Sequence, residues 1–458
     1  MEKKSSWKCV KANRAMDKCE FNISLGAKRA IELLHSRGYE AYLVGGCVRS
    51  MLLGDTISDF DITTNALPEE MLDVFKGEKT FDAGFKHGTL SVVIENETVE
   101  ITTYRVDGEY LDCRHPESVI FTNNLREDLA RRDFTMNSLA YSFEEGVIDF
   151  FGGKSDISDK IIRAVGNPNK RFEEDALRIL RAIRFSSTLG FQIEKETKEA
   201  MLKCKHLLKN ISAERIASEL CKFLLGKNVK KAILDNYEIL GELCPEFLTM
   251  KGFEQFNKWH IYDVLEHTAT AVEAIEPVHH LRLAMLFHDI GKVYTFFKDE
   301  NGVGHFYGHN EKSAEIVKKF LSKYKYDNFT KQEVYELIKI HDMYTEENRV
   351  LVKKRLNRIG KKRFLDLIKI QRADNLAQNP LLTRMEHFDI LERMVDEISK
   401  EECFSLSSLA INGRDLIAIG ISQGKLIGEL LKTLLNEVIE EKIKNERDEL
   451  INRAKELM

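Results

Sequence analysis

The sequence contains few of the residues that interrupt helices. Only six of its 458 residues are proline, while 43% are hydrophobic and 31% are charged. These proportions are typical of a folded, largely helical protein and argue against disorder. A chain of this length is too long for one compact core, so we expect two to four structural units.

Cysteine pairs and long apolar runs are also missing. The eight cysteines form no CxxC pair, which argues against a zinc ribbon or a disulfide framework and predicts reduced thiols. They are Cys9, Cys19, Cys47, Cys113, Cys204, Cys221, Cys244 and Cys403. The first thirty residues contain no apolar stretch that suits a signal peptide or a membrane span. We therefore expect a cytoplasmic protein that has no membrane partner.

The net charge of -5 is mildly acidic, so an RNA partner would have to be held by local basic patches. Two such patches occur, at residues 203–231 and 353–363. From the first we predict RNA contacts by Lys203 and Lys227. The alternative for either patch is a solvated helix face that binds nothing.

The pattern of apolar and polar residues changes near Asp156, from alternating short β-rich and helical runs to almost continuous helical periodicity. No repeat or low-complexity stretch is evident. Strands are expected at AYLV (41–44) and DFDIT (59–63), and a hairpin is expected over residues 90–106. The expected fold class is α+β, with a small mixed β-sheet first and helices after it.

Two groups of residues in the β-rich third suit nucleotide chemistry. A strand, the turn at Gly46 and a helix carrying Arg49 would offer amide donors and a guanidinium to a triphosphate. Asp59 and Asp61 lie two apart on an expected strand, so both carboxylates would face one side and could share two Mg²⁺ ions, with Glu100 as a third acid. The alternative is a pair of exposed strand acids.

Seven motifs then follow in a recognisable order over about the first 220 residues. They are LVGGCVRSMLLG, DFDITTNALPEEM, HGTLSVV, DGEYLDCRHPESV, LARRDFTMNSLAY, DFFGGKSDI and RFEEDALRILRAIRFSSTLGF. This series resembles the bacterial class II tRNA nucleotidyltransferases, the family of CCA-adding enzymes and poly(A) polymerases. The resemblance implies a nucleotidyltransferase head (22–153), a base-recognising neck (154–225), a helical body (226–380) and a helical tail that binds tRNA (381–458).

The resemblance also implies roles for individual residues. Asp59 and Asp61 would bind the catalytic Mg²⁺ ions, and the glycine turn with Arg49 would bind the triphosphate. The remaining residues expected around the nucleotide are Arg132, Asp133, Asn137, Glu174, Asp175, Arg178 and Arg181. The family usually has Asp where this chain has Ser50, which puts one polar contact at the turn in doubt.

The EDxxR motif at residues 174–178 is expected to read the base. On one helix Asp175 and Arg178 would share a face, so they could meet the Watson–Crick edge of cytosine or, after a small rotation, that of adenine. An ordinary surface ion pair is the alternative. The segment 107–116 matches the family's flexible loop, which the resemblance links to the switch from CTP to ATP.

A second constellation lies in the helical part, at about residues 259–378. HDIGK resembles the signature of the HD phosphohydrolase superfamily. The principal ligands of a divalent transition metal would be His267, His288, Asp289 and Asp374, while His309 and His341 could serve a second ion. By resemblance, the substrates would be 2′,3′-cyclic phosphates, 2′-nucleotides or terminal phosphates of RNA. A structural HD domain without activity is the alternative.

The final segment, about 404–458, has the Leu and Ile spacing of packed helices, and the family likeness adds a contact of Lys425 with tRNA phosphate. The leading hypothesis is addition of C, C and A to tRNA from CTP and ATP. A poly(A) polymerase or A-only enzyme is one alternative, and an HD phosphohydrolase with an RNA-binding head is another. The sequence leaves the oligomeric state, the metal of the HD site and its substrate open.

Overall fold

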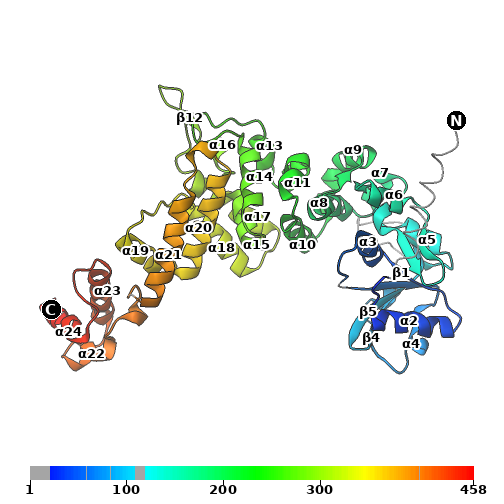
Figure 1. Ribbon diagram of the computed structural model, residues 1–458, viewed down its shortest axis with the longest axis horizontal. Coiled ribbons are helices and arrows are strands. Elements are labelled where there is room, and N and C mark those ends of the chain that lie inside the picture. The colour runs from blue at the N-terminus through cyan, green and yellow to red at the C-terminus, as the bar shows by residue number, and fades with distance from the viewer. Residues whose placement is uncertain (1–20, 58, 83, 109–118, 402, 458) are drawn as a thin grey trace, which may run out of the picture. The chain divides into compact units, whose positions relative to one another are not determined.

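The computed structural model describes residues 21–57, 59–82, 84–108, 119–401 and 403–457. These residues form two compact units, one ending at Phe223 and the other beginning at Leu224 (Figure 1). Most of the expected loop at 107–116 lies outside the described residues, as do Cys9, Cys19 and Cys113. The finer division into head, neck, body and tail stays a prediction.

A seven-stranded mixed sheet forms the base of the first unit. In spatial order its strands are β3 (Lys79–Phe81), β4 (Thr89–Ile94), β5 (Glu97–Thr103), β2 (Asp61–Thr64), β1 (Ala41–Val44), β8 (Leu139–Ser142) and β9 (Gly146–Asp149). Only the β2–β5 pair in this sheet is parallel. The sheet confirms the predicted α+β fold class.

The expected hairpin is formed by β4 and β5. Along β4 buried and half-buried residues alternate, so Leu90, Val92 and Ile94 enter the core on one face. Glu95 and Asn96 make the turn with φ values of 52° and 63°, which suit the tight turns that connect two antiparallel strands.

Helices cover the sheet and continue beyond it. α2 packs on β4 and β5, whereas α3 packs on β1 and β8 (Figure 1). The short elements of the sheet region are α2 (Leu25–Ser36), α3 (Gly46–Leu53), α4 (Pro68–Val74), η1 (Phe85–His87), β6 (Arg105–Asp107), β7 (Val119–Phe121), α5 (Leu125–Ala130), η2 (Thr135–Asn137) and α6 (Gly153–Ser158). The following elements of the unit are β10 (Ile161–Ile162), α7 (Pro168–Glu174), α8 (Leu177–Leu189), β11 (Gln192–Ile193), α9 (Lys195–Cys204), η3 (Lys205–Asn210) and α10 (Ala213–Leu224).

Over its described residues, 224–401 and 403–457, the second unit is helical apart from one small hairpin of β12 (Phe297–Lys298) and β13 (Gly304–His305). Its first helices are α11 (Val229–Asp235), α12 (Tyr237–Leu243), α13 (Glu246–Met250), α14 (Val264–Ala274), α15 (His279–Phe287), α16 (Lys292–Thr295), α17 (His309–Lys323) and α18 (Asn328–Ile340). They are followed by α19 (Arg349–Ile359), α20 (Lys361–Leu376), η4 (Pro380–Leu382), α21 (Met385–Glu401), η5 (Leu406–Ser408), α22 (Gly413–Ala418), α23 (Lys425–Ile439) and α24 (Arg447–Glu456).

The last helices have a core of their own. Leu416 of α22, Leu434 of α23 and Leu450 of α24 are fully buried in one hydrophobic cluster, as the Leu and Ile spacing predicted. Within the part of the chain that the structure describes, no helix is long and apolar enough to cross a membrane.

Candidate functional site

A cavity of about 440 Å³ in the first unit collects most of the predicted nucleotide-binding residues. It is strongly basic, because arginine side chains from four different segments line it. Its lining residues are Gly45, Gly46, Arg49, Asp61, Arg131, Arg132, Asp133, Asn137, Asp175, Leu177, Arg178, Arg181, Arg184, Phe185 and Arg215. Such a lining suits a polyanion that carries several phosphate groups.

The glycine turn forms one edge of the cavity. Gly45 caps α3 with φ of 74°, and a Cβ there would lie 2.8 Å from Nη1 of Arg132, so only glycine fits without displacing that arginine. Arg49, one turn into α3, donates from Nη1 to Oδ1 of Asn137 at 2.5 Å. The predicted strand, turn and helix are therefore present, and the guanidinium of Arg49 is held at the cavity.

The three predicted metal-binding acids do not all lie on strands. β2 begins at Asp61, so the expected strand over residues 59–63 is wrong at its start, and Asp59 precedes the strand. The reason is that pairing with β5 starts at Asp61, which is in register with Glu100 on the neighbouring strand. Partial desolvation raises the pKa of Asp61, whose side chain stays exposed; Arg132 lowers it, and the negative charges of Glu100 and Asp59 raise it further. A cation between these carboxylates would relieve that repulsion.

A buried acid anchors the opposite edge. Asp133 accepts hydrogen bonds from Nδ2 of Asn137 at 2.9 Å and from Nε of Arg181 at 2.7 Å. Burial alone raises the pKa of this carboxyl, but Arg181 and Asn137 lower it to about 2. Asp133 therefore holds two neighbouring donors in place as a permanent anion.

One aromatic ring supports three of the arginines. The guanidinium carbons of Arg49, Arg181 and Arg184 lie 5.1, 5.6 and 4.1 Å from the ring centre of Phe185, which is buried. Burial lowers the pKa of Arg184 to about 10, and the nearby Arg181 contributes to this change. Arg184 therefore keeps its charge at neutral pH, and the ring faces several cations at once.

The predicted helix through the EDxxR motif is wrong. α7 ends at Glu174 and α8 begins at Leu177, because Asp175 is extended and its Oδ1 accepts a hydrogen bond from the amide of Leu177 at 3.0 Å. Asp175 and Arg178 therefore do not sit one turn apart on a helix, although both line the cavity. The motif occupies a helix junction.

The partners of this motif differ from the expected pair. Arg178 is 2.7 Å from Oε2 of Glu174, whereas Nη2 of Arg215 in α10 is 2.7 Å from Oδ2 of Asp175. Arg178 also donates to the carbonyl oxygens of Arg171 and Arg131, both at 2.9 Å. Its guanidinium is thus held by one carboxylate and two carbonyl oxygens.

The three lysines predicted to bind RNA are exposed. Lys203 borders a separate cavity of about 610 Å³ in the first unit. Lys425, the first residue of α23, is 91% exposed and lies 3.4 Å from Glu429. In the second basic run, acids elsewhere in the chain pair with Lys353 and Lys354, at 3.0 and 2.7 Å. That run is therefore partly neutralised.

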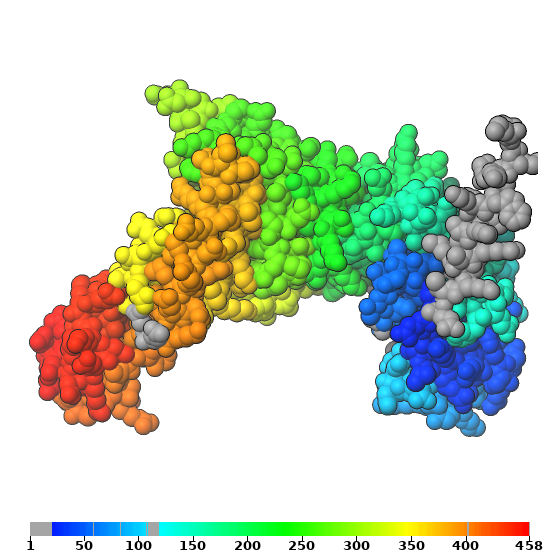
Figure 2. All heavy atoms as spheres, in the orientation of Figure 1, coloured from blue at the N-terminus to red at the C-terminus, as the bar shows by residue number. Residues whose placement is uncertain are grey.

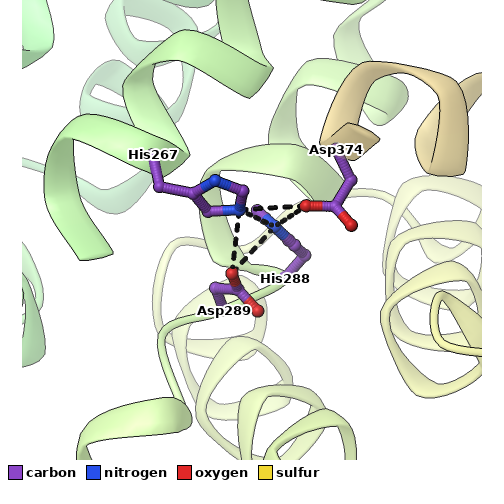
Figure 3. A group of neighbouring side chains, drawn as sticks. All are labelled: His267, His288, Asp289 and Asp374. Carbon is purple, nitrogen blue, oxygen red and sulfur yellow. Dashed lines mark hydrogen bonds and ion pairs between the residues drawn. The ribbon is translucent and has the colours of Figure 1, made fainter. Parts of the chain in front are cut away.

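A compact group of residues that could hold a metal ion, here called the metal-ligating group, lies in the second unit. The ligand atoms of His267, His288, Asp289 and Asp374 all lie within 4.8 Å of one another, and the four side chains converge on one point (Figure 3). Nε2 of His267 is 2.9 Å from Oδ1 of Asp374 and 3.1 Å from Oδ2 of Asp289. Three of the four residues are almost completely buried.

Asp289 also belongs to a second group, with His309 and His341. Its Oδ1 is 3.3 Å from Nε2 of His309, and the Nε2 atoms of His309 and His341 are 3.1 Å apart. One carboxylate thus faces two pairs of imidazoles. The six residues predicted from the sequence are brought together in space.

The four imidazoles are oriented alike. Each has its Nδ1 within 3.2 Å of a backbone carbonyl oxygen, so Nδ1 carries the proton and donates it. The carbonyls belong to Ala377, Met285, Phe306 and Ile338. Every Nε2 is left facing the carboxylates, the orientation found in protein metal sites where a backbone acceptor fixes the ring.

Charge in this cluster is shared between acids and imidazoles. Burial alone lowers the pKa values of His267 and His288, but Asp289 and Asp374 raise both to about 9. The same contacts hold the pKa of each carboxyl well below its usual range. A divalent cation would replace these protons.

Several residues at the two sites were not predicted. In the cavity they are Arg184 and Phe185, which lie within the last family motif without an assigned role, and Arg215, which lies in the basic run at 203–231 that was interpreted as an RNA-binding patch. In the metal-ligating group they are Lys292, whose Nζ is 2.6 Å from Asp289, and Asp342, which is 2.9 Å from His341. Both carried a sequence signal, because Lys292 ends the HDIGK motif and Asp342 belongs to a second HisAsp dipeptide at residues 341–342.

Three segments of the chain match the models of known protein families. Residues 41–163 match the poly A polymerase head domain, residues 190–250 match the probable RNA and SrmB-binding site of polymerase A, and residues 306–454 match the tRNA nucleotidyltransferase domain 2 (putative). The head and site thus define a nucleotidyltransferase of the poly(A) polymerase type.

Named relatives narrow this class. The CCA-adding enzyme of Lactobacillus helveticus is 34% identical over 430 residues, which are 93% of this chain and 96% of that protein. The CCA-adding enzyme of Bacillus velezensis is 46% identical over 230 residues, or 50% and 57% of the two chains. The crystal structure of the Bacillus stearothermophilus CCA-adding enzyme in complex with CTP has a TM-score of 0.71 and 30% identity, covering 94% of this chain and 96% of that one. The chain belongs to the family of CCA-adding enzymes, which are tRNA nucleotidyltransferases, and the resemblance drawn from its motifs is confirmed.

Proposed function

We propose that the first unit adds C, C and A to the 3′ end of tRNA from CTP and ATP by two-metal nucleotidyl transfer. The observation that carries this proposal is the basic cavity in which Asp61 faces a group of arginines. Relatives named as CCA-adding enzymes, including one solved with CTP, support the choice of reaction. In each step the RNA 3′-oxygen bonds to the α-phosphorus, the bond to the bridging oxygen breaks, and pyrophosphate leaves.

Asp59, Asp61 and Glu100 would hold the two Mg²⁺ ions. The fit rests on the register of Asp61 with Glu100, which places the two carboxylates on neighbouring strands; desolvation first, and then the charges of Glu100 and Asp59, raise the pKa of Asp61. When bound, the ions would activate the hydroxyl and take up charge on the pyrophosphate. The guanidiniums of Arg49 and Arg181 would hold the phosphates in line for the attack.

Arg178 and Asp175 would select the base. A guanidinium offers donors to N3 and O2 of cytosine or to N1 of adenine, and a carboxylate accepts from either exocyclic amine. Guanine and uracil present the opposite pattern at the equivalent positions. Because both residues are already held by Glu174 and Arg215, the reading edge would be preorganised.

The test is an incorporation assay on a tRNA that ends at the discriminator base, with products sequenced. Wild type is expected to add CCA. Asp61→Asn is expected to lose about a thousandfold in the rate of incorporation, because losing a metal-binding carboxylate removes several kcal/mol of charge stabilisation from the transition state. Asp73→Asn, an exposed acid on α4, is the matched control and should keep the rate. Incorporation of AMP alone would instead favour a poly(A) polymerase or an A-only enzyme.

A second candidate function is metal-dependent phosphate-ester hydrolysis in the second unit. The observation in its favour is that four histidines are anchored through Nδ1 around Asp289. One or two divalent transition metals, held by His267, His288, Asp289 and Asp374 with His309 and His341, would supply an activated water. RNA ends that carry a 2′,3′-cyclic phosphate or a terminal phosphate are the proposed substrates.

Metal content provides a readout that does not depend on activity. His288→Ala is expected to lose bound Mn²⁺ or Ni²⁺ in equilibrium dialysis while CMP incorporation stays at the wild-type rate. His35→Ala, an exposed histidine of α2, is the matched control. Equal metal content in all three proteins would rule out the site, and CMP incorporation that vanished with Asp61→Asn would rule out a head that only binds RNA.

A further inference from the structure

Three aromatic rings gather on the β12–β13 hairpin and the residues after it. Phe297 and His305 are stacked, with ring centres 5.2 Å apart and planes inclined by 24°. His305 and Tyr307 are stacked as well, at 5.5 Å and 17°, and Phe297 lies 5.7 Å from Tyr307. We call Phe297, His305 and Tyr307 the ring cluster.

The ring cluster faces solvent. Phe297 is 46% exposed and Tyr307 is 76% exposed, on a hairpin that stands out from the helices of the second unit (Figure 2). Nε2 of His305 lies 2.9 Å from Asp299 across the hairpin, so the central ring is held in place. Large apolar side chains that are held together in water commonly mark a binding surface.

The ring cluster is continuous with the metal-ligating group. A cavity of about 340 Å³ is lined by His305 and Tyr307 and also by Asp289, His309 and Asp374. Only Gly308 separates Tyr307 from His309 in the chain. The buried ammonium of Lys292 reaches the same cavity.

We propose that the ring cluster binds bases of a single-stranded RNA 3′ end and thereby delivers its terminal phosphate to the metal-ligating group. This inference rests on the proposed phosphohydrolase function and specifies its substrate as an RNA strand. Every base has a π face, so stacking on these rings holds any sequence. Because His305 and Tyr307 line one cavity with the ligands, a base stacked on them would place its phosphate beside Lys292 and the metal-ligating group.

The charges of the cavity agree with this occupant. Lys292, whose ammonium also pairs with Asp289 at 2.6 Å, is a cation in the same cavity, and Lys298 of β12 is exposed at the hairpin. An apolar peptide would gain nothing from a cavity lined by histidines, carboxylates and an ammonium. A nucleic-acid strand needs both stacking surfaces and cationic groups.

The binding test uses the full chain in EDTA and a short single-stranded RNA with 2-aminopurine as its last base and a 3′-phosphate. Stacking is expected to quench the fluorescence in wild type. Tyr307→Ala and Phe297→Ala are expected to weaken binding about tenfold, while Tyr307→Phe keeps the ring and the affinity. Phe329→Ala, a phenylalanine that is 51% exposed elsewhere in the second unit, is the matched control. Wild-type affinity in both alanine variants of the ring cluster would overturn the proposal.

A hydrolysis assay distinguishes failure of the stacking site from failure of the proposed phosphohydrolase function. With Mn²⁺ present, Tyr307→Ala is expected to raise the KM for the RNA 3′-phosphate about tenfold and to change kcat less. If wild type binds the RNA through its rings but hydrolyses neither RNA nor p-nitrophenyl phosphate, the phosphohydrolase function fails and the stacking site stands. If p-nitrophenyl phosphate is hydrolysed but the ring variants keep the wild-type KM, the stacking site fails alone.

Discussion

Arg181 approaches one oxygen of Asp133 with two of its nitrogens, Nε at 2.7 Å and Nη2 at 2.6 Å. The carboxylate is buried, whereas the guanidinium is partly open to the cavity. This pair joins the segment after α5 to α8, the helix that carries Arg178.

The pair predicts a specific pH dependence. The pKa of Asp133 falls from an ordinary value of 3.8 to about 2 in the folded protein. The contribution of this carboxylate to the free energy of unfolding is therefore fully present above pH 4 and is lost as the pH falls through 2. The shift corresponds to about 2 kcal/mol of stability. Urea unfolding of wild type and Asp133→Asn between pH 6 and pH 2 is expected to show the free-energy difference shrinking by that amount. A difference that stays constant over this range would contradict the pKa.

A second prediction concerns the support of Arg178. Glu174→Ala removes its ionic partner at 2.7 Å and leaves only two backbone acceptors. The freed guanidinium is expected to lose about tenfold in discrimination between CTP and UTP, measured as the ratio of kcat/KM values. Glu173→Ala, an exposed neighbour, should keep the wild-type ratio. Unchanged discrimination in Glu174→Ala would mean that the backbone acceptors alone position Arg178.

A third prediction concerns Phe185, which has three guanidiniums around its ring. Phe185→Leu keeps an apolar side chain but removes the π face, and each such contact is worth about 1 kcal/mol. The KM values for CTP and ATP are expected to rise about tenfold, more than kcat falls. Phe150→Leu is the control, because Phe150 has one arginine 5.8 Å away and lies outside the cavity. Equal KM values in both variants would remove any role for the ring in holding the arginines.

A fourth prediction concerns the buried pair of Lys292 and Asp289, whose atoms are 2.6 Å apart. Lys292→Met leaves a buried carboxylate with one cation fewer, a loss of about 3–5 kcal/mol. In EDTA the melting temperature of the second unit is expected to fall by about 10 °C, and Mn²⁺ should restore part of it because an ion also compensates Asp289. Lys312→Met, which removes an exposed pair of the same spacing with Glu315, should change the melting temperature little. Equal losses with and without Mn²⁺ would count against a metal at Asp289.

The sequence was most informative where a structural element or a site residue is determined by its neighbours in the chain. The strand, turn and helix around Gly46 and the hairpin at Glu95 were predictable, because each is set by local conformation. All six residues of the metal-ligating group could be named, because each stands in a short motif. Their arrangement around Asp289 could not be derived, since it depends on how five helices pack.

The errors have local and long-range causes. The helix break at Asp175 was missed because the helical spacing of apolar residues continues across it. The hydrogen bond from the amide of Leu177 to the Asp175 side chain has no unique sequence pattern. The pairing of Asp175 with Arg215 joins residues 40 positions apart, which no spacing rule anticipates. Asp59 was wrongly placed on β2 because the end of a strand depends on where its partner strand begins to pair, which the local sequence does not show.

The two oxygens of Asp289 face different pairs of imidazoles: Oδ2 faces His267 and His288, and Oδ1 faces His309 and His341. Occupancy of one position therefore withdraws electron density from the ligand of the other, and thermodynamic linkage makes that influence mutual. A metal titration of this chain should consequently follow a two-step isotherm with unequal affinities, and loss of this one carboxylate should abolish both steps together.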